Sequence, residues 1–179
     1  MLEIEVKAKV NNLELLKEKL SGLGCIFSNQ IKQDDIIFLD KSITFPDIKK
    51  RVTVLRIRNS DGKFILTLKK SEENELACIE KQIVVDDPGQ AKELLEHLGY
   101  QAVITVNKTR QKCNYKGLNI CLDKVDKLGT FIEVEKITDE TDCTKVQDEL
   151  FEFLMALGVS KEERVLVGYD TLMYKLING

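Results

Sequence analysis

Apolar and charged residues alternate strictly from Leu2 to Lys9 at the start of the chain. Leu2, Ile4, Val6 and Ala8 are separated by glutamates and lysines. Successive side chains of a β-strand point to opposite faces, so this pattern predicts a strand with one apolar and one charged face. A charged strand face by itself normally contacts water. Because the same alternation returns in later segments, the fold has to accommodate several strands that each carry a charged face.

The later segments alternate between strand-like and helix-like patterns. Helices are expected at about 13–23, 88–98, 141–157 and 169–177, with Asn12, Pro88 and Thr141 at the starts of the first three. The remaining segments give about eight strands in a mostly antiparallel order, with a polar interruption at 29–35 and a loop at 40–50. Since that many twisted antiparallel strands tend to close, we expect an α+β fold with an eight-stranded antiparallel β-barrel and flanking helices, as a single domain over residues 1–179.

Composition and charge exclude several classes of protein. The net charge of −3 provides no global positive field for nucleic acid. No apolar run approaches the ~18–20 residues of a membrane span, so no membrane contact is expected. The odd number of cysteines, without a Cys-x-x-Cys pair or a signal peptide, indicates a cytoplasmic protein. His97 is the only histidine and lies in a helical pattern, which argues against catalytic triads and histidine-rich zinc sites.

The charged residues of the predicted strands gather into groups of one sign. Glu-x-Glu pairs occur in the first strand and at 133–135, and basic residues at strand spacing occur in three segments between them. The acidic members are Glu3, Glu5, Asp123, Glu133 and Glu135, and the basic members are Lys7, Arg56, Arg58, Lys69, Lys108 and Arg110. A solvated face explains each group alone, but their segregation by sign favours a shared site.

Such faces, if turned into a barrel, need a ligand that satisfies both signs, because buried charge is costly unless it is paired. A polyphosphate with a divalent metal ion does this. Arginine and lysine bind phosphate oxygens, while carboxylates suit Mg²⁺ or Mn²⁺, which in turn bridges to phosphate. The sequence contains neither a Walker-type loop nor Gly-x-Gly-x-x-Gly, so side chains would have to hold the phosphates.

The segment Glu3-x-Glu5-x-Lys7 resembles the N-terminal Glu-x-Glu-x-Lys signature of the CYTH superfamily, the triphosphate tunnel metalloenzymes. The later motifs follow in that family's order over essentially the whole chain. They are Leu55-Arg56-Ile57-Arg58, Leu66-Thr67-Leu68-Lys69, Lys108-Thr109-Arg110, Asp123 and Glu133-Val134-Glu135. The resemblance implies an eight-stranded antiparallel tunnel that holds a triphosphate and a metal ion.

The resemblance also implies roles for individual residues. The basic set would bind phosphates and carry catalysis, and the acidic set would ligate Mg²⁺ or Mn²⁺. Glu80 is a secondary candidate that could orient cations or metal, and Lys70 is expected to point away from the site. The phosphate-binding and catalytic set is Lys7, Arg56, Arg58, Lys69, Lys108 and Arg110, and the metal set is Glu3, Glu5, Asp123, Glu133 and Glu135.

In its length and its short C-terminal extension, the chain resembles the class IV adenylate cyclases. Enzymes of that branch convert ATP to cyclic AMP and pyrophosphate. Thiamine triphosphatases and inorganic tripolyphosphatases use the same charges, so a triphosphatase is the alternative enzyme. A non-catalytic nucleotide- or polyphosphate-binding protein is an alternative of another class. The expected partner is ATP or another triphosphate compound, and a homodimer is expected because class IV cyclases are typically dimeric.

Overall fold

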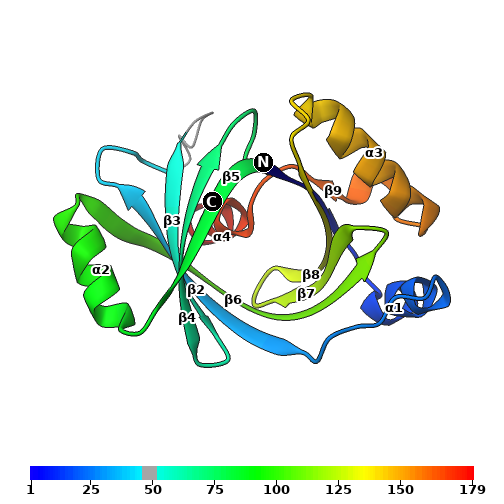
Figure 1. The fold of residues 1–179 in the computed structure, drawn as a ribbon, viewed down its shortest axis with the longest axis horizontal. Helices are drawn as coiled ribbons and strands as arrows, with labels where there is room; N and C mark the ends of the chain where they lie inside the picture. Colours follow the sequence, from blue (N-terminus) through cyan, green and yellow to red (C-terminus); the bar gives the residue numbers. More distant parts are fainter. Residues whose placement is uncertain (46–51) are drawn as a thin grey trace. The chain divides into compact units, whose positions relative to one another are not determined.

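The computed structural model describes residues 1–45 and 52–179 (Figure 1). Alternating segments form strands and segments with helical periodicity form helices, as the sequence predicts. The elements are β1 (Leu2–Lys9), α1 (Leu13–Gly22), β2 (Ile31–Asp40), β3 (Thr53–Ser60), β4 (Lys63–Ser71), β5 (Ala77–Val85), α2 (Pro88–His97), β6 (Tyr100–Tyr115), β7 (Leu118–Val125), β8 (Gly129–Thr138), α3 (Cys143–Ala156), a 3₁₀ helix (Lys161–Glu163), β9 (Arg164–Val165) and α4 (Tyr169–Asn178). Of the loop expected at 40–50, the part from residue 46 lies outside the described residues.

The strands form one sheet in the order β5-β4-β3-β2-β6-β7-β8-β1-β9, with an additional pairing of β5 with β1. The β1–β8, β2–β3, β3–β4, β4–β5 and β7–β8 pairs are antiparallel. The pairing of β5 with β1 closes the eight long strands, which confirms the predicted α+β fold with an eight-stranded antiparallel barrel. Among the helices of the described ranges, none combines the length and apolar character that a membrane crossing requires.

Two local predictions were wrong. Helix α3 is capped by Asp142, whose side chain accepts a hydrogen bond from the Lys145 amide at 3.0 Å, rather than by Thr141. Both residue types cap well, and the chain enters the helix one residue later than expected. Strand β2 begins at Ile31 and so runs through residues 31–35 of the expected polar interruption at 29–35, where Asp35 pairs with Arg58 of β3.

The chain folds as two compact units. Unit 1 comprises residues 1–31 and 109–166 and contains β1, α1, β7, β8, α3 and β9. Helix α3 packs on β1 and α1 contacts β8 (Figure 1). Ile4, Val6 and Ala8 of β1 are buried, while the alternate residues carry the charges. The apolar half of the N-terminal alternation thus belongs to the core of unit 1.

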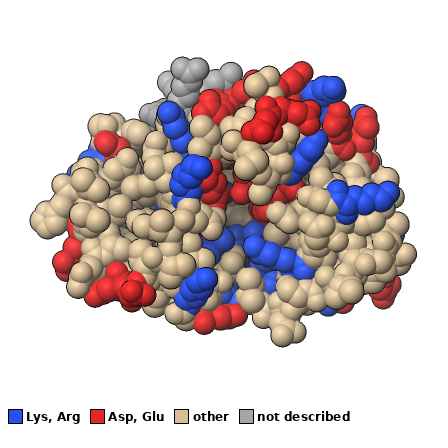
Figure 2. Space-filling view, viewed as in Figure 1, with Lys and Arg blue, Asp and Glu red and all other residues tan. Residues whose placement is uncertain are grey.

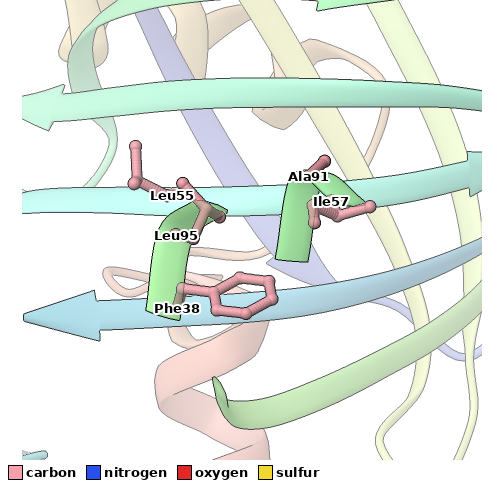
Figure 3. Close-up of a cluster of buried hydrophobic side chains, with 5 residues drawn as sticks. All are labelled: Phe38, Leu55, Ile57, Ala91 and Leu95. Atoms are coloured by element: carbon pink, nitrogen blue, oxygen red, sulfur yellow. The ribbon is translucent and has the colours of Figure 1, made fainter. Parts of the chain in front are cut away.

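Unit 2 comprises residues 32–108 and 167–179 and contains β2–β5, α2 and α4. Its core forms where α2 packs on the apolar face of β2 and β3 (Figure 3). Phe38 comes from β2, Leu55 and Ile57 from β3, and Ala91 and Leu95 from α2. Because Leu55 and Ile57 face the helix, Arg56 and Arg58, which alternate with them in the sequence, occupy the opposite face of β3.

We expect Leu95→Ala to lower the free energy of unfolding by about 2–5 kcal/mol, because it leaves a cavity in this core. Leu95 is 3% exposed, whereas its neighbour Leu94 is 57% exposed. Leu94→Ala is therefore the matched control, with an expected change within about 0.5 kcal/mol. Urea unfolding monitored by circular dichroism measures both. Equal effects of the two substitutions would contradict the packing of α2 described here.

Candidate functional site

In unit 2, a group of charged side chains occupies the face of the sheet opposite α2. We call it the cationic cluster. Among the described residues, four cations contributed by β3, β4 and β6 accompany two carboxylates from β2 and β5. The members are Asp35, Arg56, Arg58, Lys69, Glu80 and Lys108.

Asp35 binds Arg58 through two parallel hydrogen bonds. Both Arg58 Nε–Asp35 Oδ1 and Arg58 Nη2–Asp35 Oδ2 measure 2.7 Å, and both residues are buried. Burial alone would raise the pKa of the Asp35 carboxyl, but the hydrogen bond from Arg58 and the charges of Arg56, Arg58 and Lys108 lower it well below its usual range. Asp35 is therefore ionised at neutral pH and fixes the orientation of the Arg58 guanidinium.

Glu80 joins two further cations of the cluster. Its Oε2 lies 2.7 Å from Lys69 Nζ, and its Oε1 lies 3.4 Å from Arg56 Nη2. Burial would raise the pKa of Glu80, but the charges of Lys69 and Arg56 outweigh it and lower the pKa to about 2. The secondary candidate Glu80 thus lies beside the predicted phosphate-binding cations, while Lys70 is exposed, as expected.

Lys108 is held by an aromatic ring from the C-terminal helix of the same unit. Its Nζ lies 4.9 Å from the centroid of the Tyr169 ring, a cation–π distance, and both residues are buried. Tyr169 is the first residue of α4, whose N-terminus is tied down by hydrogen bonds from the Gly168 amide and the Thr171 hydroxyl to Glu75 Oε2. The C-terminal helix therefore positions one of the predicted phosphate ligands.

In unit 1, the charged face of β1 joins those of β7 and β8 and the end of β6. We call this group the carboxylate cluster. In the β1–β8 register, Glu5 lies opposite Glu135 and Lys7 lies opposite Glu133. Among the described residues, the group brings together five carboxylates, two cations and one thiol. The members are Glu3, Glu5, Lys7, Arg110, Cys121, Asp123, Glu133 and Glu135.

Arg110 is the buried centre of the carboxylate cluster. Its Nε donates to Asp123 Oδ1 at 2.6 Å, its Nη2 also pairs with Asp123 and Glu133, and its Nη1 lies 3.8 Å from Glu135 Oε1. Burial would lower the pKa of Arg110, but the charges of Asp123 and Glu133 raise it well above its ordinary value. A guanidinium that is 5% exposed can remain charged here because carboxylates surround it.

Lys7 links the first strand to the same carboxylates. Its Nζ lies 3.1 Å from Glu133 Oε1 and 3.3 Å from Glu5 Oε1, and the side chain is 2% exposed. The alternation in the N-terminal sequence thus delivers a buried ammonium group between two glutamates.

The carboxylate cluster has the donor set that a divalent cation requires. Glu3, Glu5 and Glu135 each offer an oxygen, and these oxygens lie within 4.8 Å of one another. Carboxylate oxygen donors fit Mg²⁺ or Mn²⁺. A second group, Cys121, Glu133 and Glu135, brings a thiol within the same span. Asp123 lies outside both groups and holds Arg110, so its predicted role as a metal ligand stays a prediction.

Every predicted site residue lies in one of these two clusters, but the sequence did not reveal all of their members. Asp35 was assigned to a polar interruption, although Gln33, Asp35 and Ile37 keep strand alternation. Tyr169 and Cys121 carried no signal of their own, because a ring beside a lysine or a thiol beside two glutamates arises only when distant segments pair. The face of the molecule in Figure 2 carries acidic and basic side chains among other residues.

Because the pKa of Glu80 falls from 4.5 to about 2 on folding, Glu80 stabilises the protein above pH 4.5. That contribution is lost as the pH falls from 4.5 towards 2. We expect Glu80→Gln to be less stable than the parent at pH 7, with a difference that shrinks through this window. Urea unfolding at a series of pH values measures it, with the exposed Glu93→Gln as the control. A difference that is constant with pH would contradict the pairing of Glu80.

Comparisons with known proteins identify relatives of this chain and solved structures that resemble it. A Methanocaldococcus jannaschii protein, whose name gives adenylate cyclase as a proposed activity, is 30% identical over 174 residues, or 94% of this chain and 97% of that protein. A solved structure of a Pyrococcus horikoshii protein is 29% identical with a TM-score of 0.80, covering 96% of this chain and 99% of that one. A Hippeastrum protein, a proposed adenylyl cyclase described as having a dominant triphosphatase activity, has a TM-score of 0.60 over 93% of this chain and 90% of that one. At 18% identity, that likeness shows the fold alone.

The family model described as CYTH domain matches residues 1–169, which include every residue of both clusters. Because this match spans nearly the whole chain, and the M. jannaschii relative aligns over almost its full length, the chain belongs to the CYTH domain family.

Proposed function

We propose that this chain is a metal-dependent enzyme that acts on triphosphate compounds, and first among them on ATP, as a class IV adenylate cyclase-like enzyme. The observation that carries the proposal is the chemistry of the two groups: arginines and a lysine held by carboxylates in the cationic cluster, and three carboxylate oxygens close together in the carboxylate cluster. Cations of the first kind bind phosphate oxygens, and oxygens of the second kind bind a divalent ion. A triphosphate compound with a divalent metal ion needs both kinds of group.

The cationic cluster has the chemistry of a phosphate-binding group. Arg58 is oriented by Asp35, and Arg56 and Lys69 are oriented by Glu80. Fixed guanidinium groups offer paired donors to phosphate oxygens and need little reorganisation when negative charge develops during the reaction. Lys108, held against Tyr169, adds a point charge.

The carboxylate cluster has the chemistry of a metal-binding group. We propose that Glu3, Glu5 and Glu135 hold Mg²⁺ or Mn²⁺, supported by the proximity of their oxygens. When bound, the ion neutralises charge on phosphate oxygens. Lys7 and Arg110 balance the remaining carboxylates and provide further donors to phosphate.

In the proposed reaction the ribose 3′-hydroxyl oxygen forms a bond to the α-phosphorus of ATP, and the bond to pyrophosphate breaks. The arginines and lysines stabilise the charge that develops on the phosphoryl oxygens, and they hold the triphosphate in line with the attacking hydroxyl. In the alternative, a triphosphatase, water attacks the terminal phosphorus. The Hippeastrum protein, which shares this fold, is described as having triphosphatase activity, so the fold is compatible with this second reaction.

A substrate panel tests the proposal. Purified protein is incubated with ATP, thiamine triphosphate or tripolyphosphate and either Mg²⁺ or Mn²⁺, with chelator-treated samples as controls. We expect cyclic AMP and pyrophosphate from ATP. Release of orthophosphate without cyclic AMP would show that the enzyme is a triphosphatase rather than a cyclase. Tight binding without turnover under every metal would show a non-catalytic nucleotide- or polyphosphate-binding protein.

We expect Arg56→Ala and Glu135→Ala each to lower kcat/KM by about 10²–10³, the usual loss when one fixed electrostatic contact to a reacting group is removed. Lys70→Ala is the matched control, because Lys70 follows Lys69 on the same strand but is exposed, and its activity should stay within about twofold of the parent. Steady-state kinetics measure the losses, and circular dichroism verifies the fold. Full activity of both site variants would refute the assigned roles.

A further inference from the structure

We propose that Cys121 is an additional ligand of the metal ion in the carboxylate cluster, and that it shifts the preference of this site from Mg²⁺ towards thiophilic ions such as Zn²⁺ and Co²⁺. The inference rests on the proposed function only in that a divalent metal ion binds among these carboxylates. It concerns which ion binds and through which atoms.

The register of unit 1 brings Cys121 to the carboxylates. Cys121 on β7 lies directly opposite Glu133 on β8, so both side chains are on the same face of the sheet. Cys121 Sγ lies 3.9 Å from Glu135 Oε1. One ligand atom from each of Cys121, Glu133 and Glu135 lies within 4.8 Å of the other two. A single ion could therefore be reached by all three side chains.

The surroundings of Cys121 are charged rather than apolar. A buried cysteine commonly behaves as a small apolar side chain among other apolar side chains. Cys121 is fully buried, yet the charged groups that act on it are Arg110, Glu135, Glu133 and Asp123. The thiol thus belongs to the charged face of β7, and not to the apolar core that packs against the helices.

Coordination would also change the protonation of Cys121. The thiolate is the form that binds a metal ion, so the Cys121 proton passes to solvent when the thiol coordinates.

The two ligand groups of the cluster differ in the ions that they suit. Glu3, Glu5 and Glu135 offer oxygen only, which suits Mg²⁺ and Mn²⁺. The group with Cys121 shares Glu135 but adds sulfur, which favours softer ions. Cys121 therefore makes the site of this chain more thiophilic than carboxylates alone would.

Titration of the purified, metal-free protein with Co²⁺ tests the proposal without any substrate. A Co²⁺–thiolate bond gives a charge-transfer absorption in the near ultraviolet, and we expect this band to saturate at one equivalent. Cys121→Ser should abolish the band. Cys143→Ala is the matched control, since Cys143 is another buried cysteine of unit 1 but lies at the start of α3, and it should retain the band. A missing band in the parent, or an unchanged band in Cys121→Ser, would overturn the proposal.

Competition between ions gives a second measurement. We expect Cys121→Ser to lower the affinity for Zn²⁺ relative to that for Mg²⁺. Loss of an outer-shell partner already costs roughly 10–100-fold in metal affinity, so loss of a direct ligand should cost at least as much. An unchanged ratio of the two dissociation constants would count against the thiol as a ligand.

A third measurement needs no variant, so it remains decisive if Cys121→Ser does not fold. X-ray absorption at the zinc edge of the Zn²⁺-loaded parent should include a sulfur scatterer at about 2.3 Å, beside oxygen at about 2.0–2.2 Å. Oxygen alone would overturn the proposal. These readouts are separate from the substrate panel: a protein with the sulfur scatterer but no turnover would refute the proposed activity and leave the metal ligand in place.

Discussion

The pairing of buried charges is the constraint on which the rest of this structure depends. Arg58 and Arg110 are each almost inaccessible to water, and each is bound through two nitrogens by an aspartate. An unpaired guanidinium in such a place would be strongly destabilising, by about 3–5 kcal/mol when one partner is removed. The strands that carry these residues are therefore held in register by the requirement that each charge has its partner, in addition to their backbone hydrogen bonds.

Strand alternation separates this charged face from the apolar cores. In unit 2, Leu55 and Ile57 contact α2 while Arg56 and Arg58 lie on the other face of β3. In unit 1, Ile4 and Val6 are buried while Glu5 and Lys7 join the carboxylates. Each unit thus has its own buried apolar residues, against which its helices pack. The charged face can then be selected for chemistry, because the core residues do not have to change with it.

The composition of the two clusters connects the fold of this CYTH domain protein to its proposed chemistry. In unit 2, Asp35 binds Arg58, and Glu80 pairs with Arg56 and Lys69, so cations are held on one face of the strands. In unit 1, oxygens of Glu3, Glu5 and Glu135 lie within 4.8 Å of one another. Groups of the first kind bind phosphate oxygens, and groups of the second kind bind a divalent cation.

The sequence by itself determined the alternation, and with it the strands, their apolar and charged faces and the residues of the charged sets. It did so because the face on which a strand residue lies depends only on its position along the strand. Only the tertiary structure decided which charges are partners. Asp35 binds Arg58, Tyr169 contacts Lys108 and Cys121 lies beside Glu135. These contacts join residues that are from 14 to 61 positions apart in the sequence. They depend on the register of the strands and on the tertiary fold, which brings distant segments of the chain together. No local sequence pattern encodes either.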